Sequence, residues 1–344
     1  MHATRKLWTW LAVICALSFA VLGWVGAEIY LAAPPIPQRI VSTEGRLLYS
    51  EGQVQRGQQA WLAAGGQQLG TVWGHGSYVA PDWSADWLHR EALALRQIWA
   101  LREHKAPYDS LDKPAQAALD ARVQQEMRSN TYDPGRGAIV LSPDRADAVQ
   151  EVARHYTGLF GDDRALDSLR EQYAMTANSL TDPEELAALP AFVFWSAWAA
   201  ATDRPGEAGL SYTSNWPHEP LVGNRPSASA GIWSVASIVL MLGAIAAMVM
   251  FHARSSEEAD PVPAKADPLL KLAPTPSMRA TRKYFFVVIA LILVQVAMGV
   301  VTAHYAVEGQ SFFGLPLADV LPFVVSRTIP VSYTHLTLPT TPYV

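Results

Sequence analysis

Three long apolar stretches constrain this chain more than any other feature of its sequence. They cover residues 7–27, 230–251 and 284–303, and none of them contains Asp, Glu, Lys or Arg. Each is 20 to 22 residues long, which as a helix rising about 1.5 Å per residue crosses a hydrocarbon layer of about 30 Å. Because hydrocarbon offers no hydrogen-bond partner to a bare backbone, each stretch is predicted to be a transmembrane helix.

The composition agrees with a polar domain joined to membrane spans. Charged residues make up 17% of the 344 residues, below the roughly 25% usual for soluble proteins. The mean hydropathy of +0.09 is then an average over spans and a polar domain. The net charge of −5 argues against nucleic acid as a partner, since little here would neutralise phosphates. One cysteine excludes a disulfide framework, a CxxC zinc site and a CxxCH haem attachment.

Basic residues set the expected orientation. Arg5 and Lys6 precede the first stretch, which is longer than a signal-peptide core and is therefore interpreted as a retained anchor. Six more lie between the second and third stretches: Arg254, Lys265, Lys271, Arg279, Arg282 and Lys283. By the positive-inside rule both basic segments are cytoplasmic. Residues 28–229, and the chain after residue 303, are then expected outside.

The outer segment, 28–229, is long enough for a core of its own. It opens with a Pro-rich exit at 33–37, and a Glu44-Gly45 turn between two apolar runs predicts a short hairpin. Apolar residues at helical spacing predict a helix over 86–105. Most of this domain is therefore expected to be helical.

Two Pro-containing pairs, Ser142-Pro143 and Asp182-Pro183, predict the starts of two further helices, with another helical segment at 163–175 between them. Residues 252–283, between the second and third stretches, are rich in Pro, Ala and charge and are interpreted as a linker.

Two short segments, 74–83 and 213–220, combine Gly or Pro with aromatic and ionisable residues. Such segments suit a rigid loop that presents hydrogen-bond donors, or a packed corner in which Trp and Tyr fill space. The histidines of this region do not have the spacing of a zinc site. These are His75, His89, His155 and His218.

The outer end of the third stretch carries three residues at helical spacing. If the helix continues, His304, Glu308 and Phe312 fall on one face. An imidazole and a carboxylate can bond the two oxygens of a quinol and take its protons, while an aromatic ring packs against the quinone plane. The alternative is a His and a Glu simply solvated at the helix end.

Several segments occur in an order that resembles a known family. They are KLW at 6–8, GQQAW at 57–61, HGSYVAPDWSADWLHRE at 75–91, NWPHEPL at 215–221 and TAHYAVEGQ at 302–310. In this order they resemble the amino-terminal portion of quinol-dependent nitric oxide reductases, the single-subunit members of the haem–copper oxidase superfamily. The resemblance runs from about residue 5 to 328, almost the whole chain.

The resemblance implies a mostly α-helical membrane protein with three transmembrane helices. A periplasmic cytochrome-c-like domain without haem is inserted between the first and second. The location implied is a bacterial inner membrane, crossed several times, with the N-terminus in the cytoplasm. The expected divisions are a cytoplasmic stub with the first span (1–27), the periplasmic domain (28–229), the second span (230–251), a cytoplasmic linker (252–283), the third span (284–303) and a quinol-site segment (304–328).

The resemblance also implies site residues and cofactors. It places His304, Glu308 and Phe312 in the quinol pocket. In related cytochrome-dependent enzymes a Gly-x-Tyr helps hold calcium, so Gly76 and Tyr78 are candidate neighbours of a calcium ion. The full-length enzyme would contain two b-type haems and non-haem iron, with calcium as a further candidate. Its partners would be quinol, nitric oxide and the bilayer, and a homodimer stays open.

The end of the chain departs from the family. There, the Arg-Thr equivalent to Arg327-Thr328 is followed at once by a Trp-His whose histidine ligates haem. Here PVSYTHL at 330–336 follows instead and resembles a translated sequencing-library adapter. We therefore expect residues 329–344 to be a non-native tail and do not count His335 as a ligand. The chain is then expected to be an amino-terminal fragment without the haem and iron ligands, inactive alone.

The function predicted for the parent enzyme is quinol:nitric oxide oxidoreduction, in which 2 NO become N2O and water. A respiratory and a detoxifying role both stay open. The alternative is a membrane receptor or sensor whose periplasmic domain binds a ligand. The short segment 252–283 argues against that alternative, because it leaves little room for an output domain.

Overall fold

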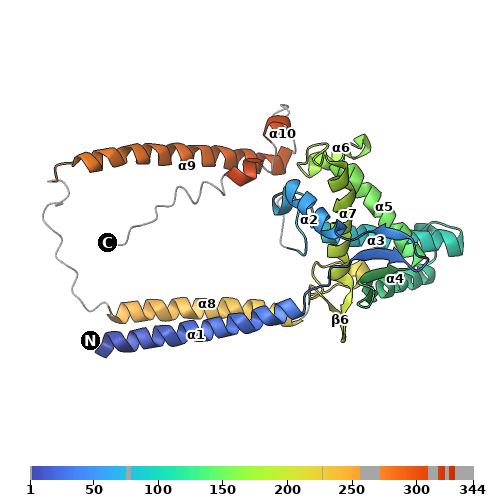
Figure 1. Cartoon of the computed structure of the whole chain (residues 1–344), viewed down its shortest axis with the longest axis horizontal. Coiled ribbons are helices and arrows are strands. Elements are labelled where there is room, and N and C mark those ends of the chain that lie inside the picture. The colour runs from blue at the N-terminus through green and yellow to red at the C-terminus, as the bar shows by residue number, and fades with distance from the viewer. Residues whose placement is uncertain are drawn as a thin grey trace.

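Three long helices extend from one side of a helical domain (Figure 1). The computed structural model describes residues 2–74, 79–226, 228–255, 272–308, 317–321 and 325–329. The long helices are α1 (His2–Leu31), α8 (Ala228–Ser255) and α9 (Pro276–Glu308). Each contains a segment long and apolar enough to cross a membrane: Trp8–Leu31, Gly231–Arg254 and Pro276–His304. The three predicted spans are confirmed as helices.

The segment predicted as a linker, 252–283, is helical at both ends. Helix α8 continues to Ser255, and α9 already begins at Pro276. Thr275 caps this start, because its side-chain oxygen accepts a hydrogen bond from the Met278 amide at 3.2 Å. A capping Thr before Pro is a helix-start signal that the Pro-rich composition obscured. Residues 256–271 lie outside the described ranges.

The domain contains six α-helices in the described residues. They are α2 (Gln53–Ala63), α3 (Trp83–Trp99), α4 (Lys113–Arg128), α5 (Pro143–Phe160), α6 (Asp167–Gln172) and α7 (Pro183–Ala201). Short 3-10 turns cover Gly66–Gln68, Tyr108–Ser110, Arg164–Leu166 and Pro220–Val222, and the four-residue helix α10 (Leu317–Val320) lies beyond α9.

Capping residues decide where several of these helices begin. The side chains of Ser142 and Asp182 cap α5 and α7, which confirms both predicted starts. The predicted start of α3 at Asp86 is wrong, because the side chain of Asp82 accepts from the Ala85 amide and the helix begins at Trp83. After Trp99 the helix continues as one π-helical turn, Ala100–His104. The turn is terminated by Lys105, whose backbone is left-handed.

Helix α7 is the central element of the domain. All its residues from Ala188 to Ala201 are buried. Its closest neighbour is α2, where a Cβ added at Gly57 would lie 2.3 Å from the carbonyl oxygen of Ala188. Two helices can approach this closely only where a glycine removes the side chain between them. Helices α3 and α5 also pack against α7.

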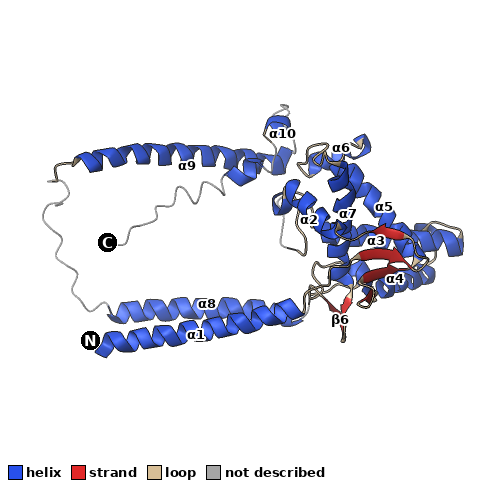
Figure 2. Cartoon of the chain, in the orientation of Figure 1, coloured by secondary structure: helices blue, strands red, loops and turns tan. Residues whose placement is uncertain are grey.

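A small sheet covers one side of these helices (Figure 2). It contains β1 (Arg39–Ser42), β2 (Leu47–Tyr49), β3 (Tyr132–Asp133) and β4 (Ala138–Leu141) in the order β2-β1-β4-β3. The predicted hairpin is confirmed as the antiparallel pair β1–β2. The parallel pairing of β1 with β4 was not predicted. A separate hairpin joins β5 (Asp203–Arg204) to β6 (Glu207–Ser211).

Large aromatic side chains fill the core of the domain. The fully buried ones include Trp83, Trp87, Trp99 and Trp198. Trp87 packs on Tyr156 with ring centroids 5.1 Å apart. Burial and the nearby Asp86 raise the pKa of Tyr156 well above its usual value.

One ion pair lies inside this aromatic core. The Nε of Arg145 donates to Oε1 of Glu91 at 2.7 Å, and both side chains are at most 1% exposed. The indole of Trp87 donates to the other oxygen of Glu91 at 2.8 Å. The buried carboxylate is therefore hydrogen-bonded on both of its oxygens, as burial of a charge requires.

Candidate functional site

The two unusual segments of the sequence, 74–83 and 213–220, meet in space. A Cβ added at Gly74 would lie 1.4 Å from the indole nitrogen of Trp216, and Gly74 has a φ of +73°. Both facts require glycine, because the backbone is left-handed and the indole of Trp216 occupies the space that a side chain would need. We call the region formed by these two segments the motif corner.

Asp82 organises the first half of the motif corner. Its carboxylate accepts hydrogen bonds from the Thr71 hydroxyl at 2.9 Å, from the Gly74 amide and from the Ser84 hydroxyl. The preceding Trp73 is held by its indole, which donates to the Ser196 carbonyl on α7 at 2.8 Å. The chain is thereby fixed on both sides of residues 75–78, which lie outside the described ranges.

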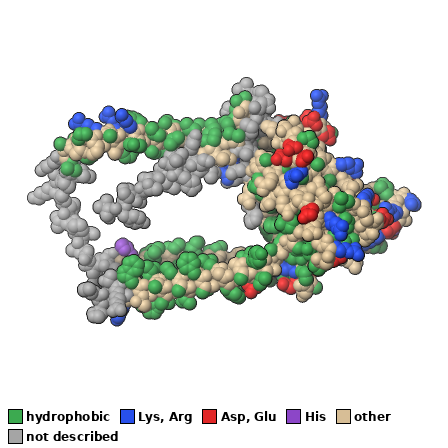
Figure 3. All heavy atoms as spheres, in the orientation of Figure 1, with side chains coloured by type: hydrophobic (Ala, Val, Ile, Leu, Met, Phe, Trp, Pro, Cys, Tyr) green, Lys and Arg blue, Asp and Glu red, His purple; other side chains and the backbone are tan. Residues whose placement is uncertain are grey.

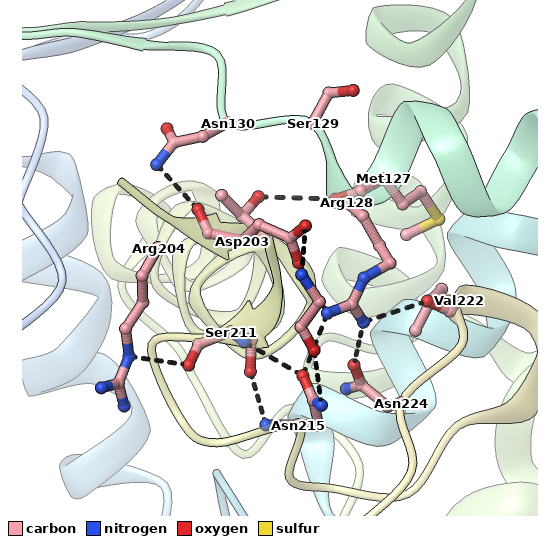
Figure 4. Close-up of polar contacts among 12 residues, drawn as sticks. Met127, Arg128, Ser129, Asn130, Asp203, Arg204, Ser211, Asn215, Val222 and Asn224 are labelled. Carbon is pink, nitrogen blue, oxygen red and sulfur yellow. Dashed lines mark hydrogen bonds and ion pairs between the residues drawn. The ribbon is translucent and has the colours of Figure 1, made fainter. Parts of the chain in front are cut away.

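Arg128 of α4 organises the second half, as Figure 4 shows. Its guanidinium donates to Asp203 at 2.6 Å, and to the side-chain oxygens of Asn215 and Asn224 at 3.1 Å each. Asn224 in turn donates to the Pro217 carbonyl at 3.0 Å. These side chains bond one another and the backbone, so the described part of this segment has the character of a packed corner.

A further contact ties the second segment to helix α3. The Nδ1 of His89 lies 3.4 Å from a carboxylate oxygen of Glu219. In the described residues, no group of three or more His, Cys, Asp or Glu is placed so that it could hold a metal ion. The calcium candidates Gly76 and Tyr78 fall outside the described residues, as does His75.

The end of α9 nearest the domain carries the quinol candidates. The helix continues through His304 to Glu308, so these two residues stand one turn apart on the same helix. The side chain of His304 is half-buried, and Phe312 lies outside the described residues.

Two contacts place this end of α9 against other described segments. Val301, on the turn before His304, packs against the buried Ala174 of the domain, as do Leu317 of α10 and Val79. The hydroxyl of Thr302 donates to the buried Ser326 hydroxyl at 3.2 Å. The helix end that carries His304 is thus packed between the domain and the segment that follows α9.

A cavity of about 460 Å³ on the flank of the domain was not predicted. Its polar lining comes from two helices and a 3-10 turn, with Arg90 and Arg96 from α3, Glu151 and His155 from α5, and Tyr108 from the turn. Burial, and then the charge of Arg90, lower the pKa of His155, while Asp86 opposes them. The lining residues are distant in the sequence and follow no shared motif, so the sequence carried no signal for this cavity.

The class of protein follows from this arrangement: a mostly helical domain held between two membrane-spanning helices, with a third span packed against it. The family of the NorB cytochrome c-like domain, from nitric oxide reductase, matches residues 37–218, more than half of the chain. The chain belongs to this family. No curated protein sequence matches it significantly.

The family match covers the domain and most of the motif corner, since it runs from just before β1 to His218. The domain nonetheless does not fit a covalently attached haem, because the chain has one cysteine, Cys15, and it lies in α1. The chain is a nitric oxide reductase-related membrane protein with a cytochrome-c-like domain inserted between its first two spans.

Proposed function

We propose that the chain is part of a membrane enzyme that oxidises quinol and reduces nitric oxide. The quinol releases two electrons and two protons, and these convert 2 NO to N2O and one water. The observation that carries the proposal is the family match over residues 37–218, in a domain flanked by membrane-spanning helices.

His304, Glu308 and Phe312 are proposed to hold the quinol. The packing of Val301 against Ala174 supports this, because it puts the turn before His304 beside the domain at the end of a span. A neutral imidazole can accept the proton of one quinol hydroxyl, and a carboxylate can accept the other. An aromatic ring stacked on the quinol ring would exclude water from the second face.

Haem and iron would supply the redox chemistry of the proposed enzyme. Two b-type haems and a non-haem iron are proposed for it on the resemblance, and calcium beside Gly76 and Tyr78. The role proposed for this chain's own residues is to bind quinol and to accept its protons. Nitric oxide, the lipid bilayer and a second copy of the chain are its proposed partners.

The domain is proposed to be periplasmic and the membrane to be the inner membrane of a bacterium. The distribution of basic residues supports this orientation. Figure 3 shows Lys and Arg side chains at the end of α9 that lies away from the domain. These include Arg279, Arg282 and Lys283, which are all exposed. By the positive-inside rule that end is cytoplasmic, so the domain is on the other side.

The test measures quinol-driven consumption of nitric oxide in membranes that contain the enzyme of which this chain is part. His304→Ala and Glu308→Ala should each lower turnover about a hundredfold, the effect expected when a positioned proton acceptor is lost. Haem absorption should be unchanged, because neither residue is proposed as a haem ligand.

The matched control is His252→Ala, the same substitution in the last turn of α8. It should leave turnover unchanged. Turnover that survives both α9 substitutions would remove the quinol site from α9. Absence of nitric oxide consumption and of b-type haem bands in the unaltered enzyme would contradict the proposed function itself.

A further inference from the structure

A second cavity lies where the domain meets the outer ends of two membrane helices. Its volume is about 1190 Å³, at or above the roughly 300–1,000 Å³ usual for small-molecule sites. Its lining includes Glu28 and Ile29 from the last turn of α1, and Gly231 and Ser234 from the first turns of α8. The cavity therefore stands at the edge of the candidate membrane layer, on the domain side.

Four aromatic side chains line this cavity: Trp73, Trp195, Tyr212 and Trp216. The indoles of Trp73 and Trp195 donate to backbone carbonyls, and their ring centroids are 5.6 Å apart. The acceptor of Trp195 is Pro35, so the same ring also fixes the chain that leaves α1. Trp216 remains 42% exposed despite its size. Trp and Tyr concentrate at the level of lipid headgroups, where an apolar ring and a polar tip are both satisfied.

Charged groups in the same cavity have the pattern of a zwitterion site. Arg204 is held by the backbone, since its guanidinium donates to the carbonyls of Ser211 and Tyr212 at 2.9 Å each (Figure 4 shows the first of these contacts). Within the described residues no carboxylate pairs with Arg204. Two carboxylates, Glu28 and Glu207, line the cavity and are exposed. A cation with neutral partners beside two carboxylates suits a ligand that carries both a phosphate and an ammonium group.

We propose that this cavity binds one zwitterionic aminophospholipid, of the phosphatidylethanolamine class. Its phosphate lies against Arg204 and its ammonium group faces Glu28 and Glu207. The aromatic rings cover the glycerol region, and the acyl chains follow the exposed apolar surfaces of α1 and α8. The bound lipid links the domain to its first two spans, and its binding is independent of the proposed quinol chemistry.

Quinol suits the cavity less well. A quinol headgroup is neutral and needs neither a cation nor a pair of carboxylates. In Figure 1 the end of α9 that meets the domain, which carries His304, lies well apart from the ends of α1 and α8 that meet it. The charges at this cavity therefore favour a phospholipid.

The test is native mass spectrometry of the full chain in detergent, with phosphatidylethanolamine, phosphatidylglycerol or ubiquinol added. We expect one retained phosphatidylethanolamine per chain and weaker retention of phosphatidylglycerol. Arg204→Gln should weaken retention about tenfold, the loss expected for one charge-assisted contact to phosphate, and Arg204→Lys should restore part of it. The matched control is Arg136→Gln, at an exposed arginine outside the cavity lining, and it should change nothing.

A second variant tests the lipid site even if loss of Arg204 disturbs the β5–β6 hairpin. The double substitution Glu28→Gln and Glu207→Gln leaves the arginine in place and removes the sites for the ammonium group. Preference should then shift from phosphatidylethanolamine to phosphatidylglycerol. Equal retention of both lipids by the unaltered chain, or one-for-one displacement of phosphatidylethanolamine by ubiquinol, would overturn the proposal.

Discussion

Leu62 on α2 and Leu242 on α8 are exposed to a similar degree, 52% and 57%. They nevertheless belong to two regions that place their apolar side chains in opposite ways, one in a buried core and the other on the surface. Around Leu62 the domain has a buried aromatic core and a charged surface. Around Leu242 almost every side chain is apolar, and none of the 18-residue window that marks the span is buried. Leu62 is therefore an apolar residue on a charged surface, whereas Leu242 is one of many exposed apolar residues.

The difference comes from the solvent that each region requires. The domain supplies its own apolar interior, so it can bury even the ion pair of Arg145 with Glu91. In the spans only the backbone is hydrogen-bonded internally, and the apolar side chains must contact lipid or other helices. A charge is therefore tolerated inside the domain only with its partner, whereas the apolar stretches 7–27, 230–251 and 284–303 contain no Asp, Glu, Lys or Arg.

The largest expected effect concerns the buried ion pair. Arg145→Met should destabilise the domain by about 3–5 kcal/mol, because it leaves the Glu91 charge buried without a cation. The exposed pair Arg46–Asp147 is the matched control, and Arg46→Met should cost at most about 1 kcal/mol. Denaturant unfolding followed by tryptophan fluorescence measures both. Equal effects of the two substitutions would show that the domain interior is wet at Glu91.

How much the sequence could predict depends on the distance over which each signal acts. The three spans were predictable because an apolar run is local, and so were the starts at Ser142 and Asp182, where the cap and the proline are adjacent. The pairing of β1 with β4, and the contact of Gly74 with Trp216, join segments far apart in the chain. Nothing local distinguishes these residues as neighbours.

The candidate site shows the same division. The helical spacing of His304 and Glu308 was predictable from four positions of sequence, and α9 does continue through both. The packing of Val301 against Ala174 was not, because it depends on how α9 meets the domain. The two unusual segments were recognised by composition, but their mutual contact required the fold. Their roles in binding stay predictions.

The second effect tests the two exposed leucines directly. Leu242→Lys should reduce membrane insertion of α8 by about 2.5–3.5 kcal/mol, since a lysine at the centre of a span is placed in hydrocarbon. Leu62→Lys should change the unfolding free energy of the domain by no more than about 0.5 kcal/mol, because the residue already faces water. Glycosylation mapping measures the membrane insertion of Leu242→Lys, and thermal unfolding measures the stability of Leu62→Lys. Full insertion of the Leu242→Lys helix would mean that this face of α8 does not contact lipid.

The smallest effect concerns pH, and it should be confined to the domain. Burial and the charge of Arg90 lower the pKa of His155 below its ordinary 6.5, so the folded domain binds this proton less readily than the unfolded chain does. The stability contributed by His155 is therefore complete above about pH 6.5, and it falls as the pH drops from there toward the lowered pKa.

His155→Gln should flatten the dependence of the melting temperature on pH between about 7 and 5. His104→Gln is the control, because that histidine is exposed and lies outside this cavity, so the slope should remain. An unchanged slope in His155→Gln would mean that the cavity beside Arg90 admits enough water to solvate a charged imidazole.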